Sequence, residues 1–209
     1  VLGYGAEDIM TTSPISLSPD GRTLYLIDSR GRDKAAFCSM DLDSGEVTVI
    51  AEDPRADIGD GMMHPTERTP QAYNVNYLRS EWHGLTEDVQ ESIDFLASRL
   101  SGDFSVASRT TDDSKWIVAH DSPERPVEYY LLDRDAEALD YLFSIRSELE
   151  RAPLVSMEGI VLTTRDGLDM PAYLTLPTGV ETDEHGLPVE PLPLVLWVHG
   201  GPWSREGWG

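Results

Sequence analysis

The segment Pro191–Trp203 reads P-L-P-L-V-L-W-V-H-G-G-P-W, and the fold of the whole chain is inferred outward from it. Its apolar run, Leu194–Val198, is continuous rather than alternating, which is typical of a strand buried on both faces of an α/β sheet. His199–Pro202, the H-G-G-P tetrapeptide, follows at once, and its two glycines permit a sharp turn and a close approach of backbone to a ligand. We therefore predict a buried strand that ends in a ligand-facing loop.

The H-G-G sequence indicates a specific chemical role for this loop. In α/β-hydrolases a loop of the H-G-G type donates one backbone N–H to the oxyanion hole, and the residue after the nucleophile donates another. Such donors stabilise the negative charge of the tetrahedral intermediate, and the loss of one costs about 3–4 kcal/mol. The alternative is an ordinary Gly-Gly turn with His199 as a loop histidine. The buried strand and the hairpin before it favour the oxyanion loop.

The residues just upstream predict a β-hairpin. Met157–Thr164 and Met170–Leu176 have strand character and are joined by the turn dipeptide Asp166-Gly167. Val180–Pro193 follows as a polar loop rich in Pro, Gly and Glu. A charged, proline-ended connector, Glu148–Pro153, precedes the hairpin, so we place a domain boundary near 150–154.

Before residue 150 the pattern changes to short antiparallel strands separated by tight turns. Pro19-Asp20-Gly21 and Asp43-Ser44-Gly45 predict turns, and residues 23–27, 36–42 and 46–50 predict strands. Residues 20–50 align without a gap with 112–142, at an offset of 92. Four-stranded propeller blades repeat every 40–50 residues or so, which makes this offset two steps with an intermediate unit near 57–108. The repeat favours a partial β-propeller over another antiparallel arrangement.

One helix is predicted inside the intermediate unit. Thr86 is the expected N-cap, the acidic Glu87 and Asp88 occupy the first turn, and Gly102 is the expected stop. An apolar stripe at helical spacing indicates an insertion that packs on a sheet edge rather than a partner-binding helix. The stripe consists of Val89, Ile93, Leu96 and Leu100.

The composition excludes several classes of partner and site. The 38 Asp and Glu residues against 16 Lys and Arg give a formal charge of −22, which disfavours nucleic acids and anionic membranes. Cys38 is the only cysteine, so neither an internal disulfide nor a multi-cysteine zinc site is possible. No apolar run approaches the ~20 residues of a membrane span.

These motifs resemble the prolyl oligopeptidase family of serine peptidases, in its branch of bacterial dipeptidyl and acylaminoacyl peptidases. The resemblance rests on the H-G-G-P segment, on T-R-D-G-L-D-M-P-A-Y-L-T-L-P at 164–177, and on S-P-D-G at 18–21 and S-R-T-T-D-D at 108–113. It implies the C-terminal blades of a β-propeller over residues 1–150, with a helical insertion near 86–101. It also implies the start of an α/β-hydrolase domain over 154–209, and a peptidase that acts on short peptides without a cofactor or metal.

By this resemblance the backbone N–H of Gly201 is the oxyanion donor, and His199, Gly200 and Pro202 shape the loop. The chain holds no G-x-S-x-G, and in this fold the nucleophile, acid and histidine all follow the H-G-G loop. We therefore expect a fragment whose triad lies beyond Gly209 and which is inactive by itself. Ser204, in the context P-W-S-R-E, is not expected to be a nucleophile.

Other conspicuous side chains receive structural interpretations. His64, His83, His120 and His185 show no ligand spacing. The acidic pairs Glu87/Asp88 and Asp112/Asp113 are interpreted as solvated helix starts or turns. The aromatic residues Trp82, Trp116 and Tyr129-Tyr130 are expected in the core of the blades rather than around a substrate cavity.

Two further functions remain open at this point: a non-enzymatic propeller that binds proteins, and an α/β-hydrolase esterase with an unrelated N-terminal domain. The hairpin and H-G-G-P loop argue against the first, and the repeat argues against the second. Endopeptidase, dipeptidyl-peptidase and acylaminoacyl-peptidase specificities are all compatible with the residues, and no oligomeric state is implied.

Overall fold

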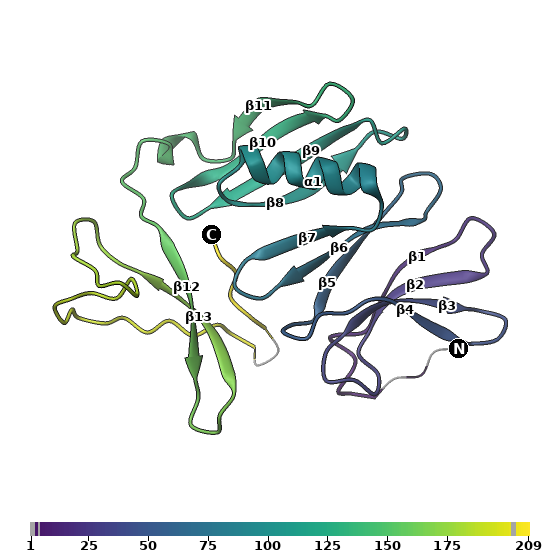
Figure 1. Cartoon of the computed structure of the whole chain (residues 1–209), viewed down its shortest axis with the longest axis horizontal. Helices are drawn as coiled ribbons and strands as arrows, with labels where there is room; N and C mark the ends of the chain where they lie inside the picture. The colour runs from purple at the N-terminus through teal and green to yellow at the C-terminus, as the bar shows by residue number, and fades with distance from the viewer. Residues whose placement is uncertain (1–2, 4, 202–203) are drawn as a thin grey trace.

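The computed structural model describes residues 3, 5–201 and 204–209 of the chain and shows antiparallel sheets with one α-helix among them (Figure 1). The first sheet is a four-stranded meander in which each strand pairs with the next. Tight turns at Gly21 and Gly45, both with positive φ, reverse the chain between its strands as the sequence predicts. The strands are β1 (Ser13–Leu17), β2 (Thr23–Asp28), β3 (Ala36–Asp41) and β4 (Val47–Ala51).

A second four-stranded meander lies 92 residues further along the chain and repeats the first in register. In the first sheet Leu24 pairs with Met40, and in the other sheet Trp116 pairs with Leu132. The β-bulges also recur, between Pro14 and Ser16 and, 92 residues later, between Val106 and Ser108. The sequence repeat is therefore a structural repeat. Its strands are β8 (Asp103–Arg109), β9 (Lys115–Ser122), β10 (Arg125–Asp133) and β11 (Ala138–Ser144).

Between these two sheets lies a three-stranded sheet followed by a helix. Its strands are β5 (Ile58–Met63), β6 (Pro70–Asn76) and β7 (Ser80–Gly84), in the order β5-β6-β7. The helix α1 (Glu87–Arg99) occupies the part of the chain in which the other two units form their fourth strand. The predicted intermediate unit near 57–108 thus exists, with a helix in place of one strand.

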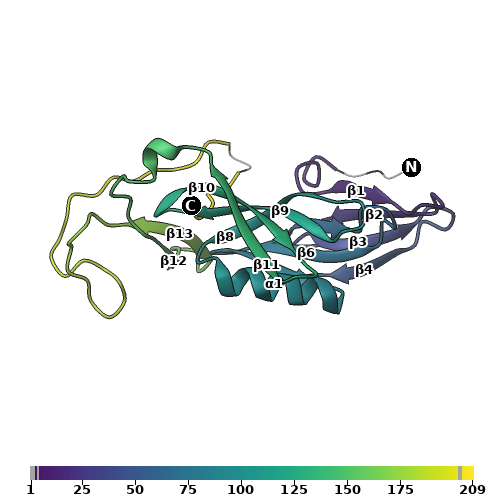
Figure 2. The ribbon, with the colours of Figure 1, turned by 90° about the horizontal axis from the view of Figure 1, so that it is seen from above.

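The helix α1 packs between the middle sheet and the β8–β11 sheet (Figures 1 and 2). All members of its predicted apolar stripe are buried, and they contact Trp116, Val118 and Leu132 of β9 and β10. Thr86 occupies the N-cap position, but Leu100 rather than Gly102 is the C-cap. Gly102 lies against β9, where a Cβ atom would come 1.9 Å from the Asp121 carbonyl oxygen. Glycine is required there by this close approach of backbone.

The predicted hairpin is confirmed as β12 (Met157–Thr163) and β13 (Asp169–Thr175), with Gly167 at positive φ in the turn. A short 3₁₀ turn, η1 (Ser147–Leu149), precedes it. In Figure 2 this hairpin and the loop after it form one end of an elongated molecule, and the β1–β4 sheet forms the other.

The predicted buried strand at 194–198 is wrong for this structure. Residues 191–199 form neither helix nor strand, and the five apolar side chains are 71–86% exposed. A strand of this kind is buried only when strands and helices on both sides cover it, and no described segment pairs with it. The described residues accordingly contain no parallel α/β sheet, so the expected start of an α/β-hydrolase domain is not observed.

Candidate functional site

The H-G-G residues lie on the surface, in irregular chain between the apolar run and the C-terminal segment. Gly201 has φ of 147°, a conformation that favours glycine, and is exposed. The Nδ1 atom of half-buried His199 lies 2.8 Å from the carbonyl oxygen of Gly200, so this imidazole interacts with its own loop. Pro202, the remaining residue of the predicted oxyanion loop, lies outside the described residues.

The segment 204–209, which follows this loop, packs back onto the sheets. The guanidinium of Arg205 donates to the carbonyl oxygens of Asn76 and Tyr77, at the turn between β6 and β7. The indole Nε1–H of Trp208 donates to the carbonyl oxygen of Met157, at the start of β12, over 2.6 Å. Contacts between segments more than 50 residues apart therefore hold the chain just after the H-G-G motif.

Arg79 completes this junction from the β6–β7 turn. Its guanidinium carbon lies 3.5 Å from the centre of the Trp208 ring, which is a cation–π contact. Asp103, at the start of β8, accepts from Arg79 Nε over 2.7 Å and from the Ser80 backbone N–H over 2.8 Å. The Asp103 carboxylate thus fixes the orientation of the guanidinium that stacks on Trp208.

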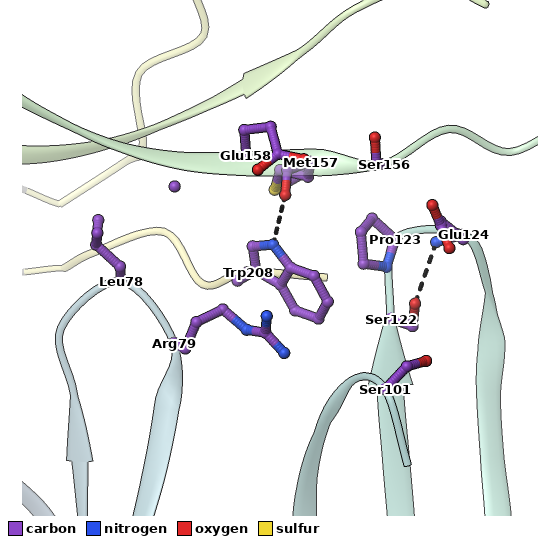
Figure 3. Close-up of a pocket in the computed structure, with 11 residues that line it drawn as sticks. Leu78, Arg79, Ser101, Ser122, Pro123, Glu124, Ser156, Met157, Glu158 and Trp208 are labelled. Carbon is purple, nitrogen blue, oxygen red and sulfur yellow. Dashed lines mark hydrogen bonds between the residues drawn. The ribbon is translucent and has the colours of Figure 1, made fainter. Parts of the chain in front are cut away.

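A cavity of about 390 Å³ opens beside Trp208, between the ends of the sheets and the start of β12 (Figure 3). Figure 3 shows Trp208 at its centre, with Arg79 on one side and Met157 on the other. Its wall mixes apolar, hydroxyl and charged side chains from the β6–β7 turn, the segment after α1, the β9–β10 turn, the start of β12 and the C-terminal segment. It is lined by Leu78, Arg79, Ser101, Ser122, Pro123, Glu124, Ser156, Met157, Glu158, Gly159 and Trp208.

A second polar arrangement, centred on Asp113, is buried in the body of the molecule. Its carboxylate is 3% exposed and accepts from the side-chain nitrogens of Gln71, Arg109, Trp116 and Arg134, over 2.8–3.1 Å. The interpretation of Asp113 as a solvated turn residue is therefore half wrong, because it forms a turn but is buried. Nothing in the local sequence shows this, since the donors come from three different strands and the end of β10.

The buried acid Asp113 belongs to a network that links α1 to the strands. Arg134 donates from Nε to Ser92 and from NH2 to Asp88, both on α1, and its guanidinium lies over the ring of Trp116. Arg109 also donates to the side-chain oxygen of Gln71 and to the carbonyl oxygen of Met63. The cluster is a structural network that joins the middle unit to the β8–β11 sheet.

The other predicted side chains are distributed through the structure. Trp116 is fully buried, and Trp82 and Tyr130 pack against the same core, as predicted. Tyr129 points to the other face of its sheet and stacks on Phe143 with ring centres 5.0 Å apart. Ser204 is exposed, and no hydrogen bond to a histidine is found for its hydroxyl within the described part of the chain.

No cluster of His, Cys, Asp or Glu able to hold a metal ion occurs among residues 3, 5–201 and 204–209. Of the helices that the structure describes, none is both long and apolar enough to cross a membrane. His120 is buried beside Glu128, His83 stacks on Tyr73, and half-buried His64 accepts from backbone N–H groups of its own turn. His185 is exposed.

Sequence comparison identifies the relatives of this chain. It is 44% identical over 203 residues to dipeptidyl aminopeptidase BIII of Pseudoxanthomonas mexicana, an alignment that covers 97% of the chain. The resemblance to the prolyl oligopeptidase family is confirmed. A second relative, dipeptidyl peptidase family member 6 of Caenorhabditis elegans, is 27% identical over 221 residues. The chain spans about 30% of the length of each, and no family model matches it.

Solved structures of prolyl oligopeptidases have a similar fold. The chain matches a prolyl endopeptidase with a TM-score of 0.53 at 10% identity, covering 81% of the chain and 25% of that protein. It matches prolyl oligopeptidase B of Galerina marginata with a TM-score of 0.52 at 13% identity, over 82% of the chain and 25% of that protein. At these identities the likeness concerns the fold alone.

Proposed function

We propose that this chain is part of a serine peptidase of the prolyl oligopeptidase family that hydrolyses short peptides by acyl transfer. The observation that carries the proposal is the H-G-G-P loop, in a chain 44% identical along nearly its whole length to a dipeptidyl aminopeptidase. In the proposed mechanism the Gly201 N–H donates to the oxyanion of the tetrahedral intermediate, and His199, Gly200 and Pro202 shape the loop. The nucleophile, acid and base would lie outside the 209 residues.

We further propose that residues 1–150 are blades of a β-propeller. In the first sheet one face, which includes Ile27 and Phe37, is buried against the middle sheet. The equivalent positions of the β8–β11 sheet are Ala119 and Tyr129, which are only half-buried, and the neighbouring Phe143 is 52% exposed. A further sheet of the same kind would cover this face, as successive blades do in a closed propeller.

The second proposed domain, residues 154–209, would begin the peptidase domain. The hairpin β12–β13 leads into it, and the exposed run Leu194–Val198 has the composition of a strand buried on both faces. In the proposed whole protein other strands would cover this run. The propeller would then limit access to the active site to short peptides.

A longer polypeptide, in which the reading frame continues to the length of the relatives, tests the proposal. We expect a G-x-S-x-G motif followed by Asp and His, labelling by a fluorophosphonate serine probe, and hydrolysis of dipeptidyl chromogenic substrates. The 209-residue chain by itself should show neither labelling nor hydrolysis. Absence of a reactive serine in the longer polypeptide would refute the peptidase proposal and favour a non-enzymatic propeller.

A variant pair tests the role of the loop in that longer polypeptide. Gly201→Pro removes the proposed donor N–H, and we expect kcat to fall about 10²–10³-fold, as it does when an oxyanion donor is lost. Gly179→Pro removes an N–H from another exposed glycine with positive φ, where a Cβ would meet nothing within 4 Å, and it lies outside both the H-G-G loop and the segment 204–209. An equal loss of kcat in both variants would contradict the assignment of Gly201.

A further inference from the structure

We propose that Arg79 and Asp103 are positioning residues for the loop that carries the H-G-G motif. This inference rests on the proposed peptidase function and assigns a role in it to the β6–β7 turn, which lies about 120 residues before the loop. The Trp208 clamp is defined as the side chains of Arg79, Asp103 and Trp208 together with the carbonyl group of Met157. Figure 3 shows Arg79, Trp208 and Met157 of this set.

The clamp is a continuous series of contacts that begins at Asp103 and ends at Met157. Asp103, whose side chain is 12% exposed, accepts from both the Arg79 side chain and the Ser80 backbone, so it holds the β6–β7 turn and the guanidinium together. The planar guanidinium then covers the indole of Trp208 at 3.5 Å. The indole N–H on the opposite edge donates to Met157. One aromatic ring thus joins β8, the β6–β7 turn and β12 to the C-terminal segment.

Two further contacts make the junction tight. Arg205 donates two hydrogen bonds to the carbonyl oxygens of Asn76 and Tyr77, in the same turn. A Cβ atom on Gly159 of β12 would come 3.2 Å from the Leu78 Cβ, so β12 and this turn are already in close contact. The turn therefore contacts both the hairpin before the H-G-G loop and the segment after it.

The length of chain between these contacts and Gly201 is short enough to restrict the loop. Arg205 is four residues after Gly201, so the Gly201 Cα lies within about 14 Å of the Arg205 Cα, and the Arg205 side chain is bound to the β6–β7 turn. A displacement of about 1 Å at a reacting group can lower the rate roughly 10²-fold. A turn of the middle sheet can thus affect catalysis without touching the substrate.

The first experiment examines the clamp in the 209-residue chain without reference to activity. The indole Nε1–H of Trp208 and the backbone N–H of Gly201 each give a peak in a ¹⁵N–¹H NMR spectrum. The variants Trp208→Phe and Gly201→Ala assign these two peaks. We expect Arg79→Ala and Asp103→Asn to shift the Trp208 indole peak towards that of free indole and to move the Gly201 peak. Arg79→Lys keeps the charge but loses the flat stacking surface, so it should restore these peaks only in part.

The matched control is Arg99→Ala, because Arg99 also lies over an aromatic ring, that of Phe95 at 5.2 Å, but on the outer surface of α1. This variant should leave both peaks in place. Arg79 is 40% exposed, so its replacement is not expected to unfold the chain, and circular dichroism checks this. Unmoved Trp208 and Gly201 peaks in a folded Arg79→Ala chain would overturn the proposal.

The second experiment uses the longer, active polypeptide and separates the clamp from the peptidase proposal. We expect Arg79→Ala to lower kcat about 10–100-fold with little change in KM, because the donor is misplaced while substrate contacts remain. A rise in KM with kcat unchanged would show that Arg79 binds substrate and would overturn its positioning role. If the NMR peaks move but no polypeptide is active, the clamp stands and the peptidase proposal fails.

Discussion

The β1–β4 and β8–β11 sheets have one backbone plan and two very different sets of side chains. Their strands, pairing register and bulges coincide at an offset of 92 residues. The turn between the first two strands contains exposed Gly21 in one sheet and buried Asp113 in the other. Both residues have positive φ, 71° and 58°. A single turn geometry therefore serves as a solvent-exposed reversal in one unit and as the centre of a polar network in the other.

The second turn of each sheet shows the same backbone conformation with a different residue. Gly45 has φ of 77°, and Glu137, 92 residues later, has φ of 48°. Glycine adopts this region without penalty, whereas an L-residue with a Cβ pays roughly 1–2 kcal/mol. The comparison teaches that the strand pattern fixes the turn geometry even where the residue at the turn is unfavourable for it.

Removal of the buried carboxylate should have the largest effect. Asp113→Ala leaves the donors of Gln71, Arg109, Trp116 and Arg134 without their shared acceptor, two of them charged. We expect the free energy of unfolding in urea to fall by about 3–5 kcal/mol, the loss typical of breaking a buried ion pair.

Two variants separate the carboxylate from the backbone at this turn. Asp113→Gly relieves the positive φ but removes the same acceptor, so it should destabilise only slightly less than Asp113→Ala. Asp112→Ala, at the exposed neighbour, should cost less than about 1 kcal/mol. If Asp113→Ala and Asp112→Ala lowered the free energy of unfolding by the same small amount, the buried carboxylate would contribute no more stability than an exposed turn aspartate.

Exchange of the residue at the second turn should have a smaller effect, of opposite sign in the two sheets. Glu137→Gly should raise the free energy of unfolding by about 1 kcal/mol, because glycine suits the positive φ. Gly45→Ala should lower it by about 1 kcal/mol for the same reason. Thermal unfolding of both variants measures these changes in the free energy of unfolding. Changes of the same sign in the two variants would show that the turns are not equivalent.

The third pair of equivalent positions predicts a pH-dependent contribution to stability in the first sheet. Asp28 ends β2, and His120 occupies the matching position in β9; both are buried. Hydrogen bonds from the Arg30 side chain hold the pKa of Asp28 below its ordinary value. Its contribution is present above about pH 4, the unfolded-state pKa, and is lost as the pH falls through the lower folded-state pKa.

We therefore expect Asp28→Asn to lower the free energy of unfolding by about 1 kcal/mol at pH 7, and by less at pH 3. Urea unfolding at the two pH values measures the difference between the variant and the parent chain. Asp43→Asn, at an exposed turn position of the same sheet, is the control and should change neither value. If the loss in the free energy of unfolding caused by Asp28→Asn is as large at pH 3 as at pH 7, the Arg30 contact does not act through the charge of Asp28.

Much of the fold follows from local features of the sequence. Turn tripeptides such as Asp43-Ser44-Gly45 and the alternation of the strands act between neighbours, so the strands and the hairpin β12–β13 were predictable. The repeat revealed β9 to β11, and the apolar spacing revealed α1. β7 and β8 were not predicted, because S-E-W-H-G has little alternation and that of D-F-S-V-A-S-R ends after four residues; pairing with β6 and β9 completes these strands.

The sequence by itself determined the order of the antiparallel elements and the H-G-G motif, which depend on residues close together in the chain. It also showed the repeat at an offset of 92 residues, because the two units carry matching local patterns. The tertiary structure alone decided that Asp113 is buried, that Arg79 stacks on Trp208, and that Leu194–Val198 lies uncovered. The physical reason is that burial and polar pairing depend on which distant segments meet. A continuous apolar run indicates a segment that favours burial, whereas its burial requires neighbouring strands.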